Sequence, residues 1–193
     1  MTLLASRTAR ALALLALIQT GVLAVMVVDR TRLLTSGREI TLPIIPVDPR
    51  DLFRGEYVEL GYAVGRVPAR LLEGPPPSPN APFYVTLEKA QDGSWTPVKL
   101  TRDKPQEAGP DRIVLKGRSR FGRLTLNGGD ANAVQNVRYG IEQYFVPQGE
   151  GPRLEALARD KKLAALIAVD GSGNAAIKGI LIDGRLQYEE PLL

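Results

Sequence analysis

The sequence contains no cysteine and no histidine. Without cysteine the chain forms no disulfide, no thiolate nucleophile and no cysteine-bound metal cluster, although this absence does not select a compartment. Without histidine it has no Ser-His-Asp triad, no histidine-bound zinc and no side chain whose ordinary pKa lies near 7. Any catalysis would therefore use carboxylates, tyrosine, lysine, serine or threonine, and we expect no cofactor and no bound metal.

A basic folded surface is also lacking, although the net charge of the chain is +4. Four arginines and one aspartate lie in the first 32 residues, and the remaining residues carry 21 basic and 20 acidic side chains. A protein that binds nucleic acid carries its basic excess on the folded domain. We therefore expect no nucleic-acid partner.

One long uncharged segment is present, residues 11–28, which we predict to be a transmembrane signal-anchor. At 1.5 Å per residue its 18 residues span about 27 Å, enough to cross a bilayer core. The flanking charges nearly balance, so they do not fix the orientation. The short tail, residues 1–10, favours a cytoplasmic N-terminus with the main domain outside. The alternative is a cleaved signal peptide, because Val22-Leu23-Ala24 fits a cleavage site.

Beyond a linker at residues 29–37, we expect one domain over residues 38–193. Alternation of apolar and polar residues predicts hairpins over 83–100 and 163–182, each with an Asp-Gly turn. Pro152 opens a short amphipathic helix. Two prolines place the strand at 38–46 at a sheet edge. The expected fold class is mainly β (α+β), an antiparallel domain with one or two short helices.

The stretch from Val47 to Val64 combines a charged turn with a strand. Asp48-Pro49 opens the turn, and from Val58 the pattern alternates, with Leu60 and Tyr62 on the same face as Val58. The segment Gly55-Glu56-Tyr57-Val58-Glu59-Leu60-Gly61-Tyr62 resembles the signature of the GDYXXLXY family, with glutamate in place of the aspartate. The run from Tyr139 to Gly149 also resembles that family. The resemblance implies a membrane-anchored bacterial envelope protein and supplies no established reaction.

The two tyrosine segments suggest an internal repeat over residues 44–100 and 113–180. Tyr57, Tyr62 and Val64 match Tyr139, Tyr144 and Val146 at a constant separation of 82 residues. The Asp-Gly-Ser turns at 92–94 and 170–172 match at 78. The hypothesis is two similar β-rich halves related by a pseudo-two-fold axis; the alternative is a chance alignment of short strands.

We consider charged and tyrosine side chains near these segments as candidate binding residues. The acidic groups at 48, 51 and 56 would suit a hard cation, but a turn network of Asp–Arg pairs explains them better. The tyrosines would line a groove or fill the core. The candidates are Asp48, Arg50, Asp51, Arg54, Glu56, Tyr57, Tyr62, Tyr139, Glu142 and Tyr144.

The expected function is a non-catalytic binding or accessory module, single-pass in the bacterial cytoplasmic (inner) membrane, with its main domain extracytoplasmic. Membrane lipid is the expected partner of residues 11–28, and the family resemblance adds a polytopic membrane protein. Two alternatives remain. One is an envelope hydrolase based on carboxylates and tyrosine. The other is a periplasmic ligand-binding protein released by cleavage near Ala24.

Overall fold

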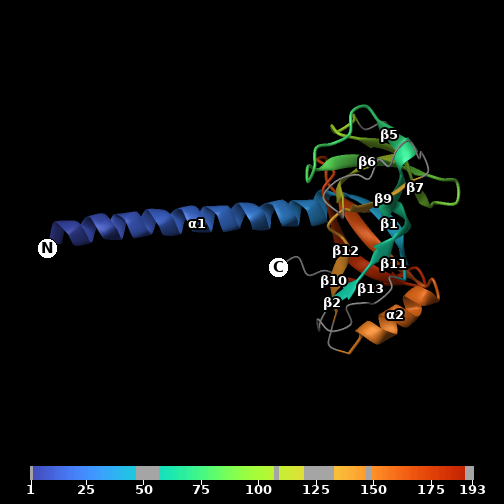
Figure 1. Cartoon of the computed structure of the whole chain (residues 1–193). Coiled ribbons are helices and arrows are strands. Elements are labelled where there is room, and N and C mark those ends of the chain that lie inside the picture. The colour runs from blue at the N-terminus through green and yellow to red at the C-terminus, as the bar shows by residue number, and fades with distance from the viewer. Residues whose placement is uncertain (1, 47–56, 107–108, 120–132, 147–148, 190–193) are drawn as a thin grey trace.

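The computed structural model shows one long helix projecting from a β-rich body (Figure 1). It describes residues 2–46, 57–106, 109–119, 133–146 and 149–189. Helix α1 (Thr2–Ser36) contains the apolar segment. The most apolar part of this helix is not buried inside the body at all. The segment expected as a linker is helical up to Ser36, because no proline or turn signal interrupts the helix before Gly37.

The described residues of the body form three sheets, built almost entirely from antiparallel pairs. One sheet has the order β13 (Arg185–Glu189), β12 (Ala175–Ile182), β11 (Leu163–Val169), β1 (Arg38–Ile45) and β3 (Gly61–Tyr62). Another has the order β4 (Arg66–Pro68), β9 (Val134–Arg138), β8 (Arg112–Ser119), β6 (Phe83–Lys89), β7 (Trp95–Thr101) and β5 (Leu72–Glu73). A two-stranded ribbon pairs β10 (Gln143–Phe145) with β2 (Tyr57–Glu59), and the shorter helical elements are η1 (Ala63–Gly65), η2 (Ala69–Leu71) and α2 (Gly151–Arg159).

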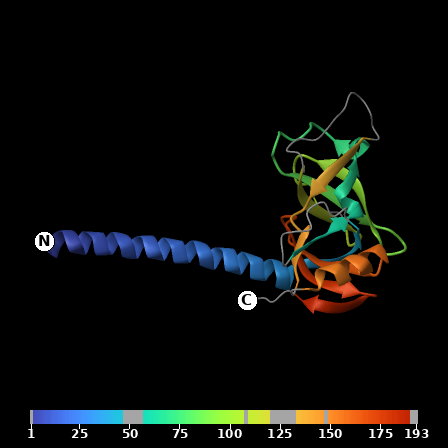
Figure 2. The same cartoon turned by 60° about the horizontal axis from the view of Figure 1, so that its bottom comes forward.

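The predicted fold class is confirmed, and so are the two predicted hairpins. Among the described pairs only β5 with β7 is parallel. Figure 2 shows the green strands of the six-stranded sheet above the red strands of the five-stranded sheet, with α2 beside the latter. The inward residues of both sheets form one core, because successive strand residues alternate between faces.

Strand β1 was expected at a sheet edge, and this prediction is wrong. The strand lies between β11 and β3. Its alternation buries Ile40, Leu42 and Ile44 in the core. Pro43 is tolerated because β3 pairs only with Ile44 and Ile45, beyond the proline, so that edge of the ladder requires no N–H from residue 43.

Helix α1 enters the body through a single connecting residue, Gly37. Leu34 in its last turn is 2% exposed, and the helix end packs on β11 and β12. The Gly37 N–H donates to the Leu33 carbonyl at 3.1 Å. A Cβ atom at Gly37 would lie 2.4 Å from that carbonyl oxygen and 3.1 Å from the Ala168 Cβ. Only glycine fits here, and the helix meets the sheet without a flexible spacer.

The short helix α2 begins where Pro152 predicted it. Leu154 and Ala158, four residues apart, are buried against the core. At its start the Tyr188 hydroxyl donates to Glu150 Oε2 at 2.9 Å, joining α2 to β13. That hydrogen bond, together with Arg153, holds the pKa of Glu150 below its usual value.

Candidate functional site

Two segments, 57–68 and 134–145, cross the body antiparallel to each other. At one end Tyr57 pairs with Phe145, and Glu59 with Gln143. At the other end Arg66 pairs with Asn136, and Pro68 with Val134. The same register continues on both sides of a central break, so the two segments form one interrupted ladder. The second segment is divided into the strands β9 and β10, because Gly140 turns the chain between them at φ 83°.

The centre of the break is held by Leu60 and Glu142. The Leu60 N–H donates to the Glu142 carbonyl at 2.8 Å. The Glu142 carboxylate accepts the N–H of Tyr139 at 2.7 Å and the N–H of Gly140 at 3.0 Å. Glu142 thus satisfies two backbone donors that the turn removes from the ladder. The Glu142 side chain therefore stabilises the backbone at the crossing of the two segments.

Two buried tyrosines fasten the segments to each other. The Tyr62 hydroxyl donates to the Ile141 carbonyl at 2.9 Å, and the Tyr139 hydroxyl donates to the Val64 carbonyl at 2.8 Å. Burial first, and the nearby Glu142 charge second, raise the pKa of both phenols far above the ordinary value. Both tyrosines therefore stay neutral hydrogen-bond donors, as the core-filling interpretation expects.

A glycine on β8 makes room for one of these rings. A Cβ atom on Gly117 would lie 2.5 Å from Val137 Cγ1 and 3.2 Å from the Tyr139 ring. Tyr139 consequently packs flat against the backbone of the six-stranded sheet while its hydroxyl reaches the other segment.

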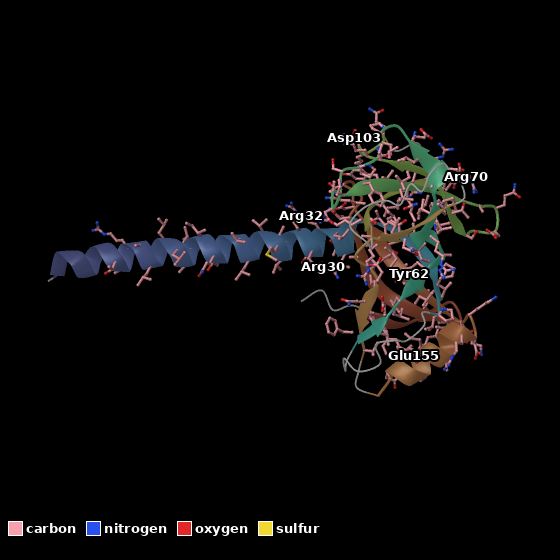
Figure 3. The ribbon with its side chains drawn as sticks, in the orientation of Figure 1. Arg30, Arg32, Tyr62, Arg70, Asp103 and Glu155 are labelled. Carbon is pink, nitrogen blue, oxygen red and sulfur yellow. The ribbon has the colours of Figure 1, made fainter. Side chains whose placement is uncertain are left out.

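An open cleft of about 170 Å³ lies beside the crossing. Tyr62, which Figure 3 labels in the middle of the body, forms part of its wall. Charged and polar groups at the cleft come from both segments: Glu59, Arg66, Asn136, Arg138 and Glu142. Arg138 Nη2 and Glu59 Oε1 form a half-exposed ion pair at 3.3 Å. The cleft thus presents both signs of charge and suits a polar ligand or an extended peptide better than an apolar one.

The structure brings together Tyr62, Tyr139, Glu142 and Tyr144 among the predicted site residues. Tyr144 is buried on β10, opposite Val58. The backbone of Tyr57 pairs with Phe145. The side chain of Tyr57 and the residues Asp48, Arg50, Asp51, Arg54 and Glu56 lie outside the described part of the chain.

The cleft residues Glu59, Arg66, Asn136 and Arg138 were missed from the sequence. Glu59 occupies the outward face of an alternating strand, which looks like an ordinary solvated position. What the sequence could not supply was the tertiary packing that brings its carboxylate to 3.3 Å from Arg138. In the described ranges, no three acidic side chains gather closely enough to hold a metal ion.

Comparison with known families identifies the chain. The family model described as GDYXXLXY protein matches residues 19–180, most of the chain. The matched range includes both tyrosine segments and both hairpins. Comparisons with curated proteins and with solved structures return no match. With its signature leucine and second tyrosine, Leu60 and Tyr62, placed at the crossing of the two segments, the chain belongs to the GDYXXLXY family.

Proposed function

We propose that the protein is a single-pass protein of the bacterial cytoplasmic membrane whose extracytoplasmic body is a non-catalytic binding or accessory module. One observation carries the proposal. The apolar segment of α1 is exposed on all sides, while the last turn of the same helix is packed into the body. An uncovered apolar surface of this length is costly in water and is satisfied by lipid.

The body lies entirely on the C-terminal side of the apolar segment, so it stands on one side of the membrane, which we take to be the extracytoplasmic side. A body that stands directly on a membrane reaches other membrane components most easily. We therefore take the partner to be another envelope component, and a polytopic membrane protein is the candidate of choice.

A binding role is supported by how the described carboxylates near the crossing are used. Glu142 accepts two backbone N–H groups, Glu59 pairs with Arg138, and Glu150 accepts from Tyr188. Paired acid and base carboxylates need environments that separate their pKa values. These three instead serve turns and contacts between elements, which favours a binding surface over a hydrolytic centre.

The absence of cysteine makes topology directly testable. We would introduce Thr8→Cys in the tail and Asp103→Cys on the exposed body in separate variants. In spheroplasts, a membrane-impermeant maleimide should label the Asp103→Cys protein and leave the Thr8→Cys protein unlabelled until lysis. Labelling of the tail in intact spheroplasts would reverse the orientation. Recovery of a shortened, soluble chain beginning near residue 25 would replace the anchor with a cleaved signal.

Glu142→Gln separates the binding module from the hydrolase. A binding module should lose thermal stability, because one of the two N–H groups loses its carboxylate acceptor, and should release its cross-linked membrane partner gradually as it destabilises. A hydrolase would lose turnover even at temperatures at which the variant is still fully folded. Glu155→Gln, at a partly buried position of α2 outside the cleft, is the matched control and should change neither property.

A further inference from the structure

The β2–β10 ribbon lies on the side of the body from which α1 projects. Figure 1 labels both strands on that side. The ribbon is a separate two-stranded sheet and is part of neither of the larger sheets. It is one of the described parts of the body that face the surroundings of α1.

A large aromatic side chain stands on the outer face of this ribbon. Phe145 is 74% exposed, the highest value among the large hydrophobic residues of the described body. Its neighbour Tyr144 points into the core, so strand alternation fixes Phe145 outward. A single exposed apolar residue is ordinary on a soluble surface. Phe145, however, lies on the side of the body from which the membrane-spanning helix projects, so its surroundings would include lipid.

The helix length sets how close the ribbon comes to lipid. Eight residues, 29–36, separate the apolar segment from Gly37, about 12 Å of helix. The interfacial layer on each side of a bilayer core is itself about 5–8 Å thick. Arg30 and Arg32, labelled in Figure 3, lie within this short span, where arginine side chains meet lipid headgroups. The near side of the body therefore stands only about 4–7 Å beyond the headgroup layer, a gap that one aromatic side chain can bridge.

The junction at Gly37 prevents the body from turning away from this surface. Leu34 is buried, and Gly37 has no space for a side chain between α1 and β11. The direction of α1 is therefore tied to the five-stranded sheet, and with it to the ribbon.

We propose that the β2–β10 ribbon rests on the bilayer that holds α1, with Phe145 inserted among the lipid headgroups. The inference rests on the proposed membrane anchoring and adds a second, peripheral lipid contact to it. Aromatic side chains on the apolar face of an interfacial segment bind at this depth. The ribbon thus holds the cleft at a fixed height and angle above the membrane.

Single-cysteine variants of the full chain test the contact without background labelling. Phe145→Cys, Arg70→Cys and Val22→Cys are each coupled to an environment-sensitive nitrobenzoxadiazole dye in phosphatidylcholine nanodiscs. Arg70 is exposed on the side of the body away from α1 and is the matched control. Val22 lies within the apolar segment and reports anchoring.

Nitroxide-bearing lipid should quench the dye at position 145 by about two-fold or more, with a blue-shifted emission, as expected for an interfacial site. Position 22 should be quenched more strongly, and position 70 should not respond. Quenching at 22 but not at 145 would overturn the ribbon contact and leave the anchor intact. No quenching at 22 would overturn the anchoring itself. If the dye at position 145 showed a blue-shifted emission in native membranes but not in pure lipid, the contact would be with a protein. That result would also overturn the proposal.

Discussion

The hairpins β6–β7 and β11–β12 have the same geometry in different surroundings. In β6–β7 the register shifts between Thr86 and Leu87. In β11–β12 it shifts between Leu166 and Ile167, 80 residues later. The turn bonds keep this separation, because Gly93 donates to Ala90 and Gly173 donates to Asp170. A β-bulge is a specific feature of a strand pair. Its recurrence at one separation indicates more than two generic hairpins.

The third strand of each unit comes from the other half of the chain. Ile113 of β8 pairs with Leu87 of the first hairpin, and Ile40 of β1 pairs with Ile167 of the second. We propose that the halves over residues 44–100 and 113–180 are repeats, that the first half extends back to Arg38 to include β1, and that the halves exchange their first strands about the crossing of the tyrosine segments. Reciprocal exchange makes each half depend on the other for its sheet.

The two units differ in what surrounds them. The turn of β11–β12 is braced, because Gly173 accepts the Lys116 N–H at 2.7 Å and Gly171 accepts the Lys104 ammonium. The end of α1 also packs on this hairpin. The turn of β6–β7 has its local Asp92–Ser94 bonds and is exposed. The β11–β12 hairpin thus contacts the end of the helix, whereas the turn of the β6–β7 hairpin faces solvent.

The largest effect should come from equivalent core positions. Leu87→Ala and Ile167→Ala should each lower the free energy of unfolding by about 2–5 kcal/mol, since both side chains are fully buried. Chemical denaturation in detergent, followed at the single tryptophan Trp95 of β7, measures both. Because the halves exchange strands, Ile167→Ala should shift the Trp95 transition as well. An unshifted Trp95 signal beside a second transition in circular dichroism would show that the halves are independent.

A smaller difference in the free energy of unfolding is expected between substitutions at the β-bulges of the two hairpins. Gly179 and Lys99 are equivalent, 80 residues apart. A Cβ atom at Gly179 would lie 2.4 Å from the Tyr188 carbonyl oxygen of β13. Gly179→Ala should therefore cost about 1–3 kcal/mol through overpacking. Lys99→Ala removes a surface ion pair with Glu73 and should cost less than about 1 kcal/mol. Equal melting temperatures for the two variants would contradict the asymmetry.

The tyrosines of the crossing should respond equally. Tyr62→Phe and Tyr139→Phe each remove one hydrogen bond between the segments and should cost about 1 kcal/mol. Their folded pKa values are raised, so above about pH 10 the unfolded chain releases protons that the folded chain retains. Stability should therefore fall as the pH rises above 10. Each variant should make this fall shallower, and the double variant shallowest. An unchanged alkaline slope would refute the buried, protonated state.

The smallest difference concerns the turns. Asp170 accepts the N–H groups of Ser172 and Asn174 and the Asn174 amide, so Asp170→Ala should cost about 0.5–1 kcal/mol. Asp92→Ala should cost less. Hydrogen bonds from Ser94 lower the pKa of Asp92, so its contribution is present above about pH 4 and is lost as the pH falls through the folded value. Asp92→Asn should flatten this acid limb in thermal melts between pH 5 and pH 2; a limb of unchanged steepness would argue against the Ser94 contacts.

The local sequence pattern was sufficient to predict the elements that a continuous stretch of residues specifies. The helix, both hairpins and the start of α2 follow from hydrophobic periodicity and from Asp-Gly and proline signals. Periodicity could not reveal the crossing, because the register between residues 57–68 and 134–145 depends on tertiary packing. The repeat alignment shows the same limit. Sequence identity matched Asp92 with Asp170, whereas backbone register matches Gly93 with Gly173, two residues away.

The single-residue connection at Gly37 has a mechanical consequence. A bilayer thinner than the apolar segment makes such a helix lean. Because α1 passes straight into β1, the whole body must lean through the same angle, and the mouth of the cleft swings with it. Under the proposed anchoring, local membrane thickness would thereby set the direction in which the cleft points.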